Sequence, residues 1–171
     1  MELHLPPKPT PTVLPGEFRF AAAGLAHGHI YGMVNGLLDA GAELVGVWDE
    51  DLKKVSAFQS AFPQAHAASC LDELLEQKCD ALVVAQGLMA SETVIYLHKK
   101  GFKLGEDIDL VTFVDYDSDI NYLYSNQMDC IIQPVEKLGE TAGELILQRI
   151  ETPDAPAFEQ VLTSTYQPCG M

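Results

Sequence analysis

The chain has 171 residues, of which 47% are hydrophobic, so it is long enough for one domain with a full core. Its 25 acidic and 10 basic residues give a formal net charge of −15, which repels phosphate backbones and argues against nucleic-acid binding. No apolar run approaches a membrane span, residues 1–16 lack the apolar core of a secretory signal, and the four cysteines match no zinc spacing. We therefore expect a cytoplasmic protein with reduced thiols and neither a membrane nor a nucleic-acid partner.

The first half alternates strands and helices after a proline-rich segment. Residues 1–16 contain five prolines, which resist helix formation and predict an extended tail. The elements expected next, in chain order, are a strand at 18–24, a helix at 29–40, a strand at 43–48, a helix at 52–62, an edge strand at 65–68 and a helix at 71–77.

The second half continues the same alternation. Its first strand, 80–85, is apolar after its first residue, which is typical of a parallel strand covered on both faces. The elements expected after it are a helix at 88–100, a strand at 108–114, a helix or loop at 119–126, a strand at 128–133, a helix at 135–150 and an extended segment at 158–166. The helix at 135–150 has the clearest apolar stripe of the chain.

Strands separated by helices of about a dozen residues predict right-handed crossovers. The expected fold is therefore α/β, with a single doubly wound parallel sheet of order 3-2-1-4-5 and room for a sixth strand. The order reverses between the strand ending at Gly24 and the strand ending at Ala85. Ligands of open α/β sheets bind outside such a reversal.

The turn after the first strand carries a glycine motif. Gly24 permits a tight turn, and the small residues Ala26 and Gly28 would let a phosphate approach a helix N-terminus. Asp49 ends the second strand, where an acid can bond ribose hydroxyls. The stretch 18–85, with Gly-Leu-Ala-His-Gly-His and Val-Gly-Val-Trp-Asp, resembles the glucose–fructose oxidoreductase and inositol dehydrogenase family. The resemblance implies that these residues and His27 lie against NAD(P).

Two further parts of that oxidoreductase family do not occur here. The family uses a Glu-Lys-Pro motif after its fifth strand and a separate substrate domain, and the Glu136-Lys137 pair of this chain is followed by leucine. Hydride transfer would then have no acid and no substrate pocket. We expect no enzyme activity and no resident cofactor, with weak NAD(P) binding as the alternative.

The second half resembles a different family. The runs 80–90, 97–108, 111–115 and 132–139 look like the effector-binding domain of lactose-repressor-type regulators, which share the periplasmic-binding-protein fold. The resemblance implies ligand-bonding polar residues after two strands, where this chain has Gln86-Gly87 and Val114-Asp115. The headpiece and partner lobe of such regulators are missing, which argues against transcriptional repression.

We therefore interpret the chain as a chimera joined within the strand 80–85, with 17–79 and 80–171 forming one composite domain. Deliberate recombination is favoured over natural fusion because the join preserves both apolar patterns. A ligand crevice is expected at Leu25, His29, Gln86, Gly87 and Asp115.

Three functions remain open: an inert folded scaffold, a residual nucleotide binder and a sugar-like small-molecule binder. No metal site is expected, because the acids that begin at position 115 lack the glycine and glutamate of a calcium loop. A homodimer is expected through surface that the missing parent domains would cover.

Overall fold

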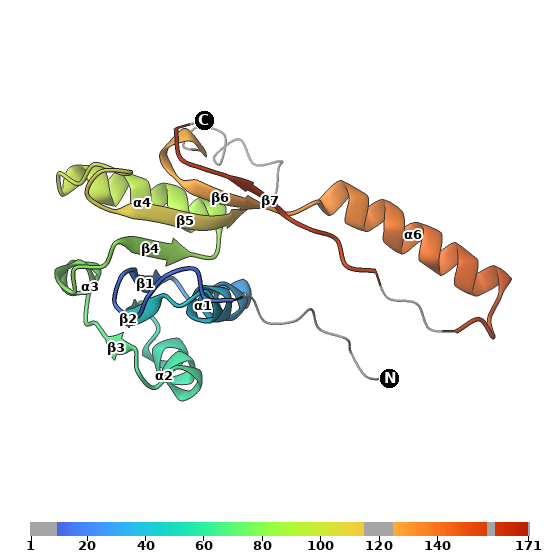
Figure 1. Cartoon of the computed structure of the whole chain (residues 1–171), viewed down its shortest axis with the longest axis horizontal. Coiled ribbons are helices and arrows are strands. Elements are labelled where there is room, and N and C mark those ends of the chain that lie inside the picture. Colours follow the sequence, from blue (N-terminus) through green and yellow to red (C-terminus); the bar gives the residue numbers. More distant parts are fainter. Residues whose placement is uncertain (1–9, 115–124, 157–159, 171) are drawn as a thin grey trace.

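The computed structural model of the chain describes residues 10–114, 125–156 and 160–170. Within these residues a seven-stranded sheet has the order β3-β2-β1-β4-β5-β6-β7 (Figure 1). The strands are β1 (Arg19–Ala23), β2 (Glu43–Trp48), β3 (His66–Ala67), β4 (Ala81–Val84), β5 (Asp109–Val114), β6 (Asp129–Ile132) and β7 (Thr165–Gln167). Strands β1 to β6 pair in parallel, whereas β7 pairs antiparallel with β6. The predicted order is confirmed and is extended by β6 and β7.

The helices follow the predicted alternation closely. They are α1 (His29–Asp39), α2 (Leu52–Ala61), α3 (Leu71–Glu76), α4 (Gly87–Lys99) and α6 (Val135–Glu151), with a 3-10 turn, η1 (Ser125–Gln127). Most of the predicted helix or loop at 119–126, the acids at 115–119 and the start of the segment at 158–166 lie outside the described residues. Of that last segment, only its end lies in β7, as residues 160–164 are not in a strand.

Strand β4 is the centre of the sheet, as its apolar run predicts. All four of its residues are buried, and it pairs with β1 on one side and β5 on the other. Leu82 and Val84 belong to the apolar cluster that includes α3 and α4, while Ala81 and Val83 belong to the cluster that includes α1 and α2. Successive side chains of β4 therefore point to opposite faces of the sheet, and each core layer receives two of the four.

The end of the proline-rich tail packs on the body. The backbone N–H groups of Thr12 and Val13 donate to Ala40 O over 2.8 and 3.3 Å. Gly41, with φ of +99°, lies so close to the tail that an added Cβ would be 2.5 Å from Val13 O. A side chain at position 41 would thus be strained by the backbone and would also displace the tail.

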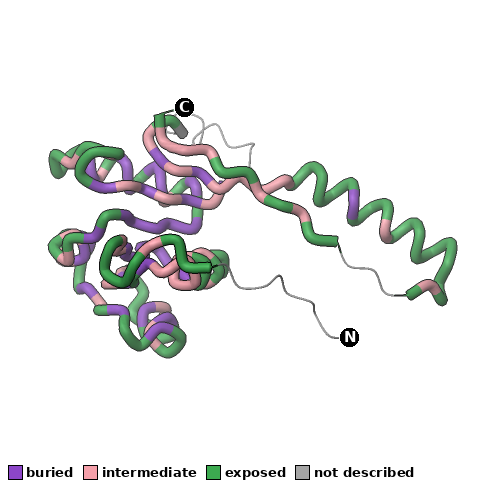
Figure 2. The backbone as a smooth tube through the Cα atoms, viewed as in Figure 1, coloured by how far each residue is buried: buried purple, intermediate pink, exposed green. Residues whose placement is uncertain are grey.

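Helix α6 forms as predicted but does not cover the sheet. It begins after Pro134 and points away from the body, so most of its residues are exposed (Figures 1 and 2). Thr141 is the buried residue of this helix, and Leu145 is half-buried. The amphipathic pattern predicts the helix correctly, but it does not specify which surface receives the apolar stripe.

Candidate functional site

The carboxyl edge of the sheet contains the predicted reversal of strand order. Strands β1 and β4 are neighbours, but the helices that follow them pack on opposite faces. Ile30 of α1 joins the cluster of Phe20, whereas Val94 of α4 joins the cluster of Leu82. The loops after β1 and β4 therefore diverge, which is the geometry that opens a ligand crevice in such sheets.

A cleft of about 660 Å³ lies beside the ends of β1 and β2. It contains Gly24, Ala26 and Asp49, three of the residues predicted to contact a cofactor, together with Trp48 and Tyr96. The fold thus brings the glycine turn after β1 and the acid that follows β2 to the same cleft. His27 and Gly28, the other two predicted contacts, are exposed residues of the loop that leads into α1.

Asp49 is used inside the protein. Its Oδ2 accepts the backbone N–H of Leu25, and its Oδ1 accepts that of Asp51 over 2.8 Å. Lys54 Nζ lies 3.8 Å from Oδ1, and Asp49 is 7% exposed. The carboxylate therefore fastens the loop after β1 to the end of β2, and little of it is presented to a ribose.

Met89 fills the space against the glycine turn. Gly24 has a φ of +73°, and an added Cβ would be 2.1 Å from Met89 Cε. The position therefore requires glycine for its backbone angle and for the approach of this side chain. Met89 is the third residue of α4, so a side chain of the second half closes the turn of the first.

The cleft is acidic. Its lining contains four carboxylates and one ammonium group, which are those of Asp49, Glu50, Asp51, Glu92 and Lys54. Asp51 is partly committed as the N-cap of α2, where it accepts from Lys53 N over 2.9 Å. Because the acids outnumber the cation, the cleft repels a pyrophosphate and favours neutral or cationic groups.

Aromatic rings from both halves meet at the start of α1. The rings of His27 and His29 stack with centroids 4.4 Å apart, and His29 lies 4.8 Å from the ring of Phe113 at the end of β5. Both histidines are exposed and Phe113 is half-buried. Gly28 caps α1 without a side-chain hydrogen bond, and no acidic residue occupies the first turn.

The predicted crevice residues differ in their exposure to solvent. His29 and Gln86 are exposed at the carboxyl edge, whereas Leu25 and Gly87 are buried and shape the loops rather than line a cavity. Asp115 lies outside the described residues. His29 and Gln86 are therefore the crevice residues whose side chains can meet a ligand.

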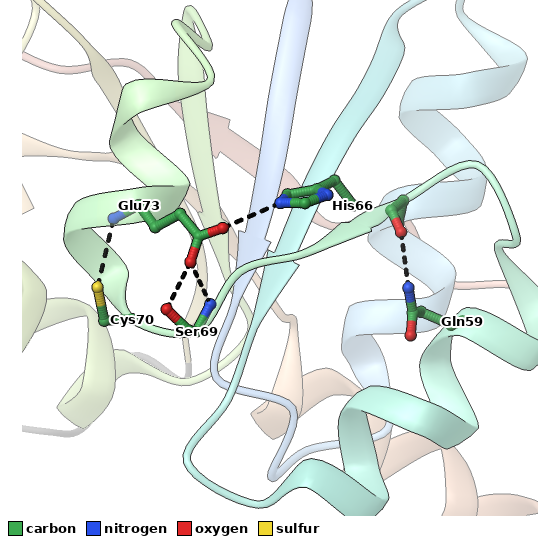
Figure 3. Close-up of polar contacts among 6 residues, drawn as sticks. Gln59, His66, Ser69, Cys70 and Glu73 are labelled. Atoms are coloured by element: carbon green, nitrogen blue, oxygen red, sulfur yellow. Dashed lines mark hydrogen bonds and ion pairs between the residues drawn. The ribbon is translucent and has the colours of Figure 1, made fainter.

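A polar network surrounds Glu73, and the sequence patterns did not predict it. Its carboxylate accepts the N–H and hydroxyl of Ser69 and contacts His66 Nε2 over 3.1 Å, while Cys70 caps α3 (Figure 3). These hydrogen bonds, those from Ser69 first, lower the pKa of Glu73 to about 2. His66 contacts Glu73 rather than Ser69, and a carboxylate with a pKa of about 2 is too weak a base to activate the Ser69 hydroxyl that donates to it. The network is therefore a helix cap.

A second network borders the cleft. Asp72 accepts from Lys100 Nζ and from the hydroxyl of Tyr96, each over 2.7 Å. The Lys100 bond, followed by the Tyr96 bond, lowers the pKa of Asp72. Tyr96 of α4 and Lys100, the C-cap of α4, lie 24 and 28 residues from Asp72 of α3, so no local spacing could have revealed these bonds.

The described residues contain neither a metal-binding cluster nor a membrane-spanning helix. No group of three or more histidine, cysteine, aspartate or glutamate side chains is placed to hold a metal ion. In the same part of the chain, no helix is both long and apolar enough to cross a membrane.

Comparison with known proteins relates most of the chain to one family. The model of the periplasmic binding protein-like domain matches residues 22–168. The repressor PurR of Aliivibrio salmonicida is 28% identical over 97 residues, which are 55% of this chain and 28% of that protein. A LacI-family regulator of Enterococcus faecalis, solved with bound ribose, is 19% identical with a TM-score of 0.61, over 91% of this chain and 55% of that one. This chain therefore spans little more than half of the relative's structure.

The same comparisons bear on the prediction that the chain is a chimera joined within residues 80–85. A proposed oxidoreductase of Erwinia carotovora atroseptica is 25% identical over 77% of this chain and 42% of that one, but its TM-score of 0.48 is too low to support an argument. The family match runs through the predicted junction at 80–85 without a break, and no comparison shows an oxidoreductase-derived first half. The fold, the order of the strands and this match agree, and the chain belongs to the family of periplasmic binding protein-like domains.

Proposed function

We propose that this chain binds a small, neutral, hydroxyl-bearing molecule at the carboxyl edge of its sheet, between the start of α1 and the end of β4. The observation that carries this proposal is the contact of His29 with Phe113, with ring centroids 4.8 Å apart. It places an aromatic surface, built by both halves of the chain, beside the reversal of strand order. Such a surface with a few polar groups is typical of small-molecule sites.

Polar groups and charge narrow the ligand class. Gln86 follows β4, which lies between the strands that lead to His29 and Phe113, and its exposed amide can both donate and accept hydrogen bonds. The chain carries a net charge of −15, and the neighbouring cleft is acidic, so an anionic ligand is disfavoured. The ribose bound to the Enterococcus faecalis relative supports a sugar as the first candidate.

Thermal unfolding in the presence of ribose and other neutral sugars tests this proposal. A sugar that binds the folded state raises the unfolding temperature, since a ligand at a hundred times its Kd adds about 2.7 kcal/mol to stability. His29→Ala is expected to weaken binding by about tenfold, or about 1.4 kcal/mol. His98→Ala is the matched control, because His98 is also exposed but lies in the last turn of α4. A flat response to every sugar would refute the proposal.

Nucleotide binding in the acidic cleft is the second candidate. The cleft of about 660 Å³ with Gly24, Ala26 and Asp49 favours it, while the surplus of carboxylates opposes it. Calorimetric titration with NAD(H) would support it at a Kd below about 1 mM, or −4.1 kcal/mol. Asp49→Ala is expected to weaken NAD(H) binding. Because Asp49 also holds the loop after β1, the Kd of the variant must be compared with that of the wild type at the same fraction of folded protein.

If neither a sugar nor NAD(H) binds, the chain is a folded scaffold without evolved activity. This outcome would agree with the chimeric, engineered origin that we inferred from the sequence. Under each of the three outcomes the chain is a binding module or a scaffold rather than an enzyme.

A further inference from the structure

Helix α6 presents an apolar stripe to solvent. Its apolar residues recur every three or four positions, and the exposed fractions of the larger ones range from 37% to 68%. The stripe comprises Val135, Leu138, Ala142, Ile146 and Ile150. The glutamates of the helix lie on its other side. An amphipathic helix of this kind is normally stabilised by burying its stripe.

A groove lies at the base of the same helix. It has a volume of about 660 Å³ and includes Ile132, Pro134, Val135 and Tyr166 among its lining residues. Tyr166 is 62% exposed although its hydroxyl donates to Asp129 over 2.7 Å. Each copy of the chain therefore carries an unburied apolar stripe on α6 and, next to it, an unfilled groove whose walls are partly apolar and partly polar.

We propose that a second copy of this chain covers α6, in a twofold dimer in which each α6 stripe lies against the body of the other copy, at the groove beside its α6. A helix of 17 residues is ~25 Å long and ~10 Å wide, so one covered stripe removes ~250 Å² from each of two surfaces. Pairing the two helices alone would bury ~500 Å², which is typical of a crystal contact. Two reciprocal helix-on-body contacts bury ~1,000 Å², which is the area that a biological interface is expected to reach, and twofold symmetry makes the two contacts identical.

The size of the relatives agrees with this occupant. The chain spans 55% of the ribose-bound relative's structure, so two copies supply about as much protein as one relative. Charge sets a condition on the dimer, because each copy brings a net charge of −15. The dimer is expected to tighten with salt, since the Debye length falls from ~30 Å at 0.01 M to ~8 Å at 0.15 M.

Sedimentation equilibrium of the full chain over a concentration series tests the proposal. Ile146→Glu is expected to raise the dimer Kd by about tenfold or more, since a carboxylate would be buried in an apolar contact. Leu147→Glu is the matched control. The two residues are adjacent and are exposed to 61% and 62%, but they point about 100° apart around the helix, so Leu147 lies off the stripe.

Three outcomes overturn the inference: a wild-type chain that is monomeric throughout the series, equal effects of the two substitutions, or a dimer that salt weakens. The last would indicate a charge-paired interface elsewhere. The salt series uses only wild-type protein, so it tests the proposed dimer even if the Ile146→Glu variant does not fold. A monomer that still binds a sugar would refute this inference and leave the proposed function intact.

Discussion

Asp49 shows how a residue can occupy the predicted place and serve another purpose. The sequence places an acid at the end of the second strand, and Asp49 directly follows β2 and lines the cleft. Each of its oxygens nevertheless accepts a backbone N–H, from Leu25 and Asp51, which the motif alone does not reveal. Both carboxylate oxygens of Asp49 already accept hydrogen bonds from the backbone, so the ribose contact inferred from the motif is still a prediction.

Thr112 in β5 provides a test at the same scale. Its residue is fully buried, and its Oγ1 has no hydrogen-bond partner within the described part of the chain. Thr112→Val removes an unsatisfied polar group at nearly constant volume, so the free energy of unfolding should rise by about 1 kcal/mol. Urea denaturation measures this change.

Thr93→Val is the control for that experiment. Thr93 is 9% exposed, and its hydroxyl donates to Met89 O over 2.8 Å, so its loss should lower stability by about 1 kcal/mol. Equal shifts in the two variants would show that the hydroxyl of Thr112 is satisfied after all.

At the scale of elements, α3 depends on a cap rather than on length. The helix has six residues, too few to be stable alone, and Glu73 ties it to Ser69 and His66. The carboxylate form makes these bonds, and its pKa of about 2 lies below the ordinary 4.5. A depressed pKa means that the stabilisation is complete above pH 4.5 and is lost as the pH falls toward 2.

Glu73→Gln is therefore expected to lower the unfolding temperature at neutral pH. The difference from wild type should shrink as the pH falls from 4.5 to about 2, because the wild-type carboxylate then becomes protonated. Glu76→Gln on the same helix, outside this network, controls for the general loss of one acid. A difference that is constant over this range, or equal for both variants, would argue against the cap.

At the scale of the whole molecule, a single sheet joins the two inferred halves through β1 and β4. Two apolar clusters on its opposite faces share β4, with Leu82 in one and Val83 in the other. Shared strands couple the two layers, so we expect one cooperative unfolding transition rather than one for each half.

This expectation can be tested with two probes. Trp48, the one tryptophan of the chain, packs against the α3 and α4 cluster, and its fluorescence should follow the same curve as far-UV circular dichroism. Leu82→Ala should shift both curves together, by about 2–5 kcal/mol. Separate curves, or a shift of only one of them, would show two independently folding lobes.

The sequence by itself determined the alternation of strands and helices, the strand order through β5 and the burial of β4. These features depend on periodicity and on local turn residues, which act over a few positions. Only the tertiary structure decided which surfaces receive those elements: the stripe of α6 faces solvent, Met89 closes the glycine turn, and Tyr96 reaches Asp72. Each of these outcomes depends on groups far apart in the chain, and spacing along the sequence does not encode that distance.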